Sequence, residues 1–315
     1  MSRSDSPATP DAEGGWSASY EVDLAAVLGP FARGGGDPCT VVTGPRRVWR
    51  ACRTPDGPGT LRIDADRLDV SVAAWGPGAS WLVASVPDLL GFADQQPSES
   101  VMARLPEHLA PAWRRLARSW RVPRSRLVLE ALVAAVLEQK VTGVQSRRAW
   151  RSLVVETGDP APGPVPRPMH TLPDAADLRR VPSWTWHRWG VTPHQAAALQ
   201  SALASPGRLA ECADLSHDRA RARLRAIRGI GEWTTSEVAQ RALGDADAVS
   251  FGDFHLANQV VHAFTGERNG TDERMGELLA PFAGHRYRVQ RAVERSGIVR
   301  PARGPRMTIS DHRRH

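Results

Sequence analysis

The sequence predicts an α+β domain followed by an all-α region, and three observations lead to this fold class. Between residues 39 and 75, short apolar segments alternate with Gly, Pro and Asp turns, which is typical of an antiparallel meander. From about residue 109 onward, apolar residues recur at the three- and four-residue spacing of helices. The proline-rich stretch GDPAPGPVPRPM (158–169) interrupts this pattern and predicts a loop.

Composition divides the chain into four parts. Residues 1–15 are small and polar and predict a disordered leader. The α+β domain is expected over 16–105, the all-α region over 106–297, and a basic tail over 298–315. The chain begins without the apolar segment of a signal peptide and has no run of about 18 apolar residues, so we expect a cytoplasmic protein.

The expected helices follow from apolar spacing and turn residues. GPFARGGGDP (29–38) and GPGASWLVASVPDLLGF (76–92) predict a helix on each side of the meander, the second broken at Pro87. The segment 124–140 carries an apolar stripe that ends just before Lys140. Further helices are expected at 142–156, 193–204, 215–227, 232–243, 253–264 and 272–295.

Charge and cysteine content narrow the function classes. The formal net charge is +7 and the sequence pI is about 10.4, which favours a polyanionic partner. Lys140 is the only lysine among 41 basic residues, so almost no amine is available for covalent chemistry. Three cysteines without CxxC spacing exclude a four-thiolate zinc site and a four-cysteine iron–sulfur cluster.

The segment RLRAIRGIGEWTTSEVAQRAL (223–243) predicts a helix, a tight turn and a second helix. Gly229 and Gly231 permit positive φ and allow another backbone to come close. The second helix begins near Glu232, so its unpaired N–H groups and the glycine amides form a potential phosphate site. The alternative is a simple connection between two helices, with glycines only for tightness.

The pattern LxxIxGIGxWT (224–234), followed by a carboxylate about twenty residues later, resembles the helix-hairpin-helix DNA glycosylase superfamily. More closely, it is similar to the 3-methyladenine DNA glycosylase II (AlkA-like) family. LEALVAAVLEQKVT (129–142) resembles that family's helix ending in a glutamine-bearing turn near the DNA. WGPGASWLVASVPDLLGF (75–92) resembles the end of its N-terminal domain, an antiparallel sheet with helices related to the TATA-binding-protein half-fold.

This resemblance implies a role for particular residues. The amides of Gly229, Gly231 and Thr234 would hold a DNA phosphate, and Gln139 and Lys140 would lie in the turn that contacts DNA. The carbonyls of Arg225, Ile227 and Gly229 would ligate a structural monovalent cation, Na⁺ or K⁺, and no other cofactor is implied. Asp253 would be the catalytic carboxylate, and Trp233, Glu237 and Phe254 would line the substrate pocket.

A single carboxylate suits the excision of an alkylated purine. Cleavage of the glycosidic bond passes through an oxocarbenium-like sugar, which Asp253 would stabilise while it orients or deprotonates water. An N3- or N7-alkylated purine carries positive charge and leaves as a neutral base, so the need for a general acid is relaxed. An aromatic wall such as Trp233 would attract this electron-poor base through stacking and cation–π attraction. The alternatives are an N-cap role for Asp253 and core packing for Trp233.

Several positions depart from the family pattern. Lys140 stands where a leucine wedge is usual, and Glu237 and Glu294 stand where pocket aromatics are expected. Glu237 has an alternative role in an i,i+4 ion pair with Arg241. The three tryptophans of PSWTWHRWG (182–190) are expected to be core and capping aromatics rather than base contacts.

The sequence therefore predicts a monomeric, cytoplasmic (nucleoid-associated) and monofunctional DNA glycosylase of base excision repair. It would bind double-stranded DNA containing damaged bases and excise alkylated purines of the 3-methyladenine and 7-methylguanine type, leaving an abasic site. Tryptophan at position 233 cannot form the Schiff base that bifunctional members form with lysine. Two alternatives remain: a non-catalytic helix-hairpin-helix module that binds DNA or recruits repair partners, and a glycosylase for a deaminated or oxidised base.

Overall fold

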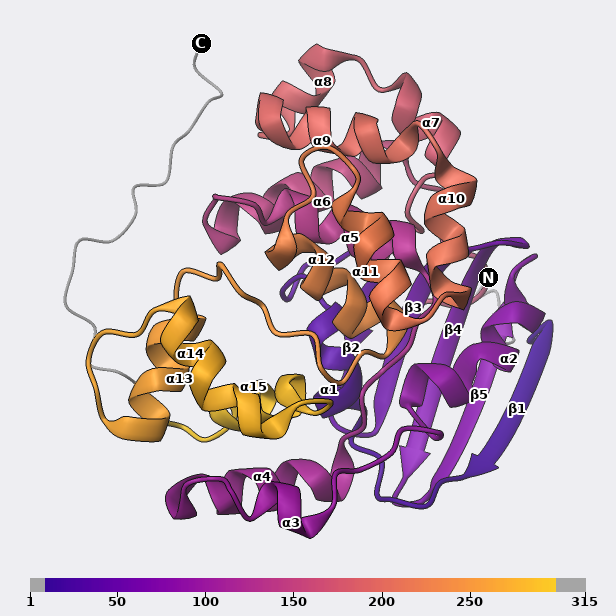
Figure 1. Ribbon diagram of the computed structural model, residues 1–315. Helices are drawn as coiled ribbons and strands as arrows, with labels where there is room; N and C mark the ends of the chain where they lie inside the picture. Colours follow the sequence, from indigo (N-terminus) through magenta and orange to yellow (C-terminus); the bar gives the residue numbers. More distant parts are fainter. Residues whose placement is uncertain (1–8, 299–315) are drawn as a thin grey trace.

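The computed structural model describes residues 9–298 and consists of one antiparallel sheet and a larger set of helices (Figure 1). The strands are β1 (Ala12–Ser17), β2 (Thr40–Val42), β3 (Arg47–Thr54), β4 (Gly57–Asp66) and β5 (Asp69–Trp75). They lie in the order β1-β5-β4-β3-β2, and each adjacent pair is antiparallel. This arrangement confirms the α+β start of the chain, and its relation to the TATA-binding-protein half-fold stays a prediction.

Strand β1 corrects the expected extent of the disordered leader. Residues 12–15 were assigned to that leader, but they belong to a strand in which Ala12 pairs with Ala74 and Trp16 with Val70. The glycines at 14 and 15 give no strand signal in the sequence, because glycine has low strand propensity. Gly14 is required by packing, since a Cβ there would collide with the Trp16 ring. Residues 1–8 of the predicted leader and all but the first residue of the basic tail lie outside the described residues.

Two helices accompany the sheet. Helix α1 (Leu24–Leu28) precedes the expected segment 29–38, which contributes a short 3₁₀ turn and then a loop. Helix α2 (Ala79–Leu90) packs on β4 and β5 and continues through Pro87, so the expected break at that residue is wrong. The helix ends one turn later at Gly91, which has φ +73°.

The remaining chain is helical, as predicted. Its helices are α3 (Glu99–Met102), α4 (Ala110–Ser119), α5 (Val128–Leu137), α6 (Gly143–Thr157), α7 (Ala175–Arg180), α8 (Ser183–Arg188), α9 (Pro193–Leu203), α10 (Pro206–Ala210), α11 (His217–Arg225), α12 (Glu232–Val238), α13 (Leu256–Thr265), α14 (Asp272–Leu279) and α15 (Arg286–Glu294). A π-helical turn at 239–243 extends α12. The single helix expected at 272–295 is wrong, because a 3₁₀ turn containing Pro281 and a bend at Gly284 separate α14 from α15.

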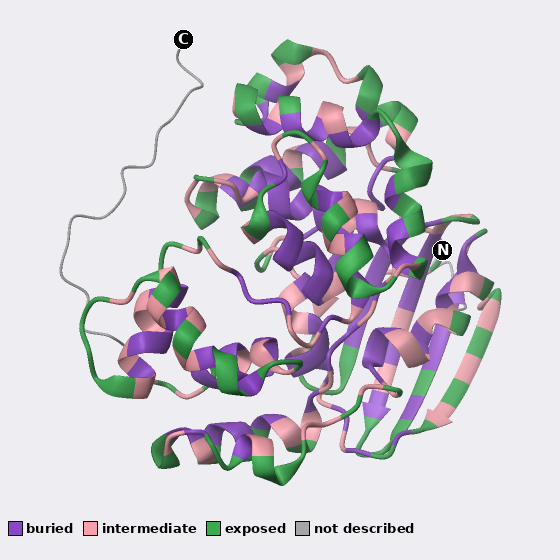
Figure 2. Cartoon of the chain, in the orientation of Figure 1, coloured by how far each residue is buried: buried purple, intermediate pink, exposed green. Residues whose placement is uncertain are grey.

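The hydrophobic cores do not follow the predicted boundary near residue 105. One core joins the inner face of the sheet, α2 and α4 to the C-terminal helices α13–α15. A second core is built from α5–α12, and Figure 2 shows α5 as one of its most buried elements. A smaller cluster on the outer face of the sheet contains Trp49 and Trp75, whose rings stack at 5.8 Å, and Met169 from the proline-rich loop.

A buried ion pair connects the sheet to the helices. Arg50 of β3 pairs with Glu130 of α5 and lies over the Phe31 ring at 4.4 Å. Arg50 is 1% exposed, so the charge depends on these partners for its solvation. The pair therefore fixes α5, which carries the turn containing Gln139 and Lys140, relative to the N-terminal domain.

Candidate active site

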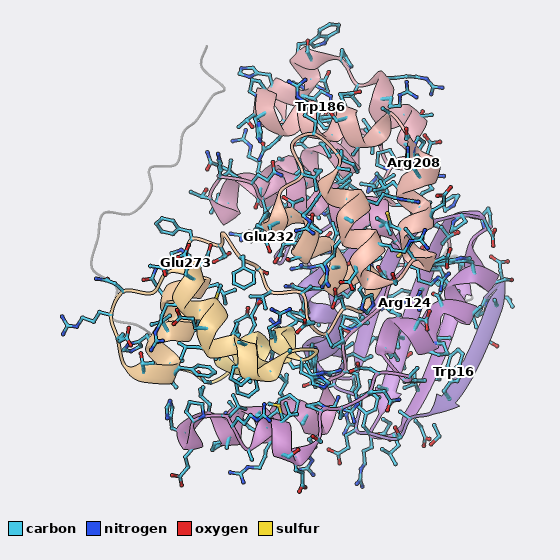
Figure 3. The ribbon with its side chains drawn as sticks, viewed as in Figure 1. Trp16, Arg124, Trp186, Arg208, Glu232 and Glu273 are labelled. Atoms are coloured by element: carbon cyan, nitrogen blue, oxygen red, sulfur yellow. The ribbon has the colours of Figure 1, made fainter. Side chains whose placement is uncertain are left out.

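The predicted hairpin forms between α11 and α12, and its two glycines differ in role. Gly229 has φ +86°, and a Cβ there would lie 2.7 Å from the Ala198 Cβ of α9. Gly229 thus uses the positive φ that glycine permits. Gly231 does not, because its φ is −89°. Gly231 is exposed and has no atom within 4 Å of the position of a Cβ, so its backbone is open to a ligand. Glu232, labelled in Figure 3, is the first residue of α12.

Gln139 contacts the hairpin directly. Its Nε2 donates to the Gly229 carbonyl at 3.1 Å and to the Thr234 hydroxyl at 2.8 Å. Gln195 of α9 donates in turn to the carbonyls of Leu137 and Gln139. The turn after α5 is therefore joined to the hairpin by side-chain hydrogen bonds, and the Gln139 amide points into the protein.

Lys140 stands at the tip of this turn. It is exposed and has φ +53°, which is uncommon for a residue with a Cβ. The helix that follows has a Thr142–Gln145 capping box, which fixes the direction in which the chain leaves the turn. The structure thus presents the single lysine of the chain to solvent on the element that also carries Gln139.

Asp253 has one oxygen bound by the protein and one available. Its Oδ1 accepts hydrogen bonds from the N–H groups of His255 at 2.8 Å and Leu256 at 2.9 Å. Asp253 thus bonds N–H groups at the start of α13 as a capping side chain does, although α13 begins at Leu256 rather than at the expected residue 253 and His255 occupies the N-cap position. Among the described residues, Oδ2 has no hydrogen-bond or ion-pair partner. A capping carboxylate with one free oxygen can still stabilise a cation beside it.

A cavity of about 80 Å³ lies beside Asp253. Its lining combines residues from the segment before α13, from α13 and from α15, and most carry hydrogen-bonding side chains. The lining residues are Ser250, Asp253, His255, Leu256, Gln259, Gln290 and Glu294. Figure 1 shows the segment before α13 running between the α5–α12 group and the α13–α15 group.

Trp233 packs against the segment that carries Asp253. A Cβ at Gly252 would lie 3.9 Å from the Trp233 Cβ, so the start of α12 and the segment that carries Asp253 are neighbours, although Trp233 is not among the residues that line the cavity. Trp233 is half-buried, and its buried indole N–H has no hydrogen-bond partner among the described residues. Phe254 is 83% exposed and contacts the His255 ring edge-on at 4.8 Å.

Glu237 is held inside the protein. One carboxylate oxygen accepts from Arg241 at 2.7 Å, and the other accepts from the Ser250 hydroxyl at 2.7 Å. Burial raises the pKa of Glu237, but Arg241 and Ser250 outweigh this effect and hold the pKa below its usual value. The predicted i,i+4 ion pair with Arg241 is confirmed, and both oxygens of Glu237 are occupied.

Glu294 of α15 reaches the same cavity as Asp253. Its Oε1 accepts from Gln290 at 2.9 Å, and its Oε2 pairs with Arg291. Gln290 also accepts a hydrogen bond from the Ser250 N–H at 3.2 Å. The sequence indicated Glu294 as a departure, but it gave no signal for Ser250 or Gln290, which lie 40 residues apart in the chain.

The tryptophan cluster at 182–190 divides in two. Trp186 and Trp189 are buried and contact each other edge-on at 5.3 Å, as expected of core aromatics. Trp184 is 73% exposed, so the expectation of a packed side chain is wrong there. Figure 3 labels Trp186, which belongs to α8, and α8 contacts α9.

The carbonyls expected to bind a cation are partly engaged. The Gly229 carbonyl accepts from Gln139, and the Ile227 carbonyl accepts from the Ile230 N–H at 3.0 Å. Each carbonyl oxygen has a second lone pair, so these bonds leave room for coordination. Within residues 9–298, no group of three or more His, Cys, Asp or Glu side chains is placed to hold a metal ion. Over the same residues, no helix is long and apolar enough to span a bilayer.

Comparison with known proteins identifies the fold. No family model matches the chain. A curated Mycobacterium tuberculosis protein, "Probable bifunctional transcriptional activator/DNA repair enzyme AlkA", is 33% identical over 137 residues, which are 43% of this chain. This match spans 27% of the relative's length.

Two solved structures extend the likeness to almost the whole chain. The 3-methyladenine DNA glycosylase from Archaeoglobus fulgidus superposes with a TM-score of 0.74 at 15% identity, over 89% of this chain and 96% of that one. The 8-oxoguanine glycosylase/lyase from Clostridium acetobutylicum gives a TM-score of 0.67 at 8% identity, over 91% and 99% of the two chains. The chain therefore has the fold of DNA glycosylases and, over 137 residues, resembles an AlkA-type repair enzyme in sequence.

Proposed function

We propose that this protein is a monofunctional DNA glycosylase that excises alkylated purines from duplex DNA. The observation that carries the proposal is Asp253, whose Oδ1 is fixed by two backbone N–H groups while Oδ2 faces no partner among the described residues. Trp233 lies next to Gly252, the residue before this carboxylate, and the open Gly231 backbone lies two residues before that tryptophan. The similarity to an AlkA-type enzyme and to a 3-methyladenine glycosylase supports this choice.

The site residues have complementary roles in this mechanism. The amides of Gly229, Gly231 and Thr234 bind a backbone phosphate, and Lys140 contacts a phosphate or a groove edge near the lesion. The flipped base stacks on Trp233, with Phe254 as a second contact. Asp253 stabilises the sugar cation as the base leaves, and water completes the hydrolysis. Glu237 contributes by holding Ser250, because both of its own oxygens are already bonded.

A monovalent cation at the hairpin is a separate part of the proposal. The carbonyls of Arg225, Ile227 and Gly229 would hold Na⁺ or K⁺, with the Gly229 oxygen shared between the ion and Gln139. Replacing NaCl or KCl by choline chloride at constant ionic strength should weaken binding to an abasic-site duplex. Equal affinity in all three salts would exclude a functional cation.

The decisive experiment is base release from methylated duplex DNA. The wild-type protein should liberate 3-methyladenine and 7-methylguanine, whereas Asp253→Asn should lose release by at least a thousandfold and still bind a tetrahydrofuran abasic-analogue duplex. The asparagine keeps the capping oxygen, so the test separates charge from structure. Loss of both binding and release would make Asp253 a structural residue. Release of hypoxanthine or 8-oxoguanine instead of alkylated bases would assign the site to another lesion.

A further inference from the structure

Glu294 is the second carboxylate of the cavity beside Asp253, and the proposed mechanism has not used it. It comes from α15, whereas Asp253 precedes α13, so two separate elements bring the acids to one cavity. Glu294 is anchored through Gln290 Nε2 at 2.9 Å and through the Arg291 guanidinium. Arg291 is itself half-buried and compensates the negative charge.

The cavity has the size and lining of a water site. Its volume of about 80 Å³ is well above the roughly 10–15 Å³ that one water molecule requires by the same measure, so the cavity has room for water. All lining residues except Leu256 carry a hydrogen-bonding side chain. The Gln259 side chain has no hydrogen-bond partner among the described residues, so its amide is available to a bound water.

We propose that this cavity binds the nucleophilic water of the glycosylase reaction and that Glu294 is its positioning residue. The inference rests on the proposed function. Ionised carboxylates only accept hydrogen bonds. A water that donates one proton to Asp253 Oδ2 and the other to Glu294 keeps a lone pair free for C1′ of the sugar. Inverting glycosidases likewise use a carboxylate to hold the attacking water.

The chemical step balances without a further reactant. The C1′–N bond breaks, and its electron pair leaves with the base, so a cationic alkylpurine departs neutral. The water oxygen forms the new bond to C1′, and its proton passes to Asp253 and then to solvent. Glu294 takes no proton in this step and stays paired with Arg291. Its task is to hold the water in line with C1′.

Competition between water and methanol tests this role. Capture of the sugar cation by methanol gives a methyl glycoside in the DNA, and capture by water gives an abasic site. We expect Glu294→Ala to slow single-turnover release of 3-methyladenine and 7-methylguanine by the same factor, about tenfold or more. It should also raise the ratio of methyl glycoside to abasic product several-fold, because the shortened side chain gives methanol room and removes the anchor of the water. Glu294→Gln retains an acceptor oxygen and should restore the wild-type product ratio.

Glu277→Ala is the matched control, because Glu277 forms the same i,i+3 pair with an arginine, Arg274, on the exposed side of α14. It should change neither rate nor product ratio. Binding to a tetrahydrofuran duplex and thermal melting verify that each variant is folded. An unchanged product ratio in folded Glu294→Ala would refute the inference, as would a rate loss confined to one lesion, which would mean that Glu294 contacts the base. If wild-type protein releases no alkylated base, the proposed function fails, and this inference fails with it.

Discussion

Replacement of Gly229 by alanine should destabilise the protein because two separate costs coincide at this residue. The backbone has φ +86°, which costs an L-residue about 1–2 kcal/mol. The added Cβ would lie 2.7 Å from the Ala198 Cβ, and overpacking of this kind costs about 1–3 kcal/mol. The free energy of unfolding should therefore fall by about 2–5 kcal/mol. That is a large part of the roughly 5–15 kcal/mol typical of a domain.

Gly231→Ala is the matched comparison two residues away. With φ −89° and open space around the new methyl group, it should change the free energy of unfolding by no more than about 0.5 kcal/mol. It should nevertheless weaken DNA binding, because the methyl group would stand where the phosphate approaches the backbone. Gly229→Ala combined with Ala198→Gly removes the steric contact and should show a favourable coupling of about 1–3 kcal/mol.

Urea denaturation followed by tryptophan fluorescence measures these differences, since the chain has 11 tryptophans. The reasoning is refuted if Gly229→Ala unfolds within about 0.5 kcal/mol of the wild type. It is equally refuted if the two glycine variants are destabilised to the same extent, because the distinction between a strained turn and an open one would then be wrong.

Three further predictions concern charged side chains. Borohydride should trap no covalent adduct on alkylated DNA, and an adduct that disappears in Lys140→Ala would establish lyase chemistry. The same variant should make the log–log salt slope of DNA binding less steep by about 0.9. Glu130→Leu should lower the free energy of unfolding by about 3–5 kcal/mol, because it leaves the Arg50 charge buried without its partner. Adding Arg50→Met to this variant should recover most of the loss. Equal urea midpoints for the single and the double variant would contradict this prediction. The pKa of Glu237 is lowered in the folded protein, so its ionisation adds stability that is present above the unfolded pKa of about 4.3 and is lost as the pH falls through the lower folded pKa. Glu237→Gln should therefore make the melting temperature fall less steeply with decreasing pH. An unchanged acid limb of this profile would show that the ion pair does not contribute.

Local signals in the sequence were sufficient for elements that depend on their own residues. The start of α6 is an example, because the Thr142–Gln145 capping box and the apolar spacing after it lie within one short segment. Strand β1 could not be found in this way. Its segment, AEGGWS, has little strand propensity and becomes a strand by pairing with β5, about 57 residues later in the chain. The paired residues run from Ala12 with Ala74 to Ser17 with Asp69.

The candidate site shows the same division between local and distant information. The hairpin pattern and the spacing after it indicate Trp233 and Asp253, whose roles in the site stay predictions. The hydrogen bond from the Leu256 N–H to Asp253 is the local feature that the structure confirms. The surroundings of Asp253 could not be predicted, since Ser250 meets Glu237 across 13 residues and Gln290 across 40. These contacts depend on how α12 and α15 pack, and that packing has no counterpart in residue spacing.

Glu237 is where this difference matters most for function. The sequence places it one turn after Trp233 and leaves two roles open, a contact with substrate and an i,i+4 pair with Arg241. The structure confirms the pair and adds Ser250 as a second partner. Ser250 lies three residues before Asp253, and its N–H donates to Gln290. The Glu237 carboxylate therefore ties the segment carrying Asp253 to the helix carrying Trp233. Since DNA is expected to bind at the start of that helix, a buried ion pair fixes the separation between the proposed phosphate site and the proposed catalytic carboxylate. A glutamate in place of a pocket aromatic thus has a structural reason that requires no new substrate.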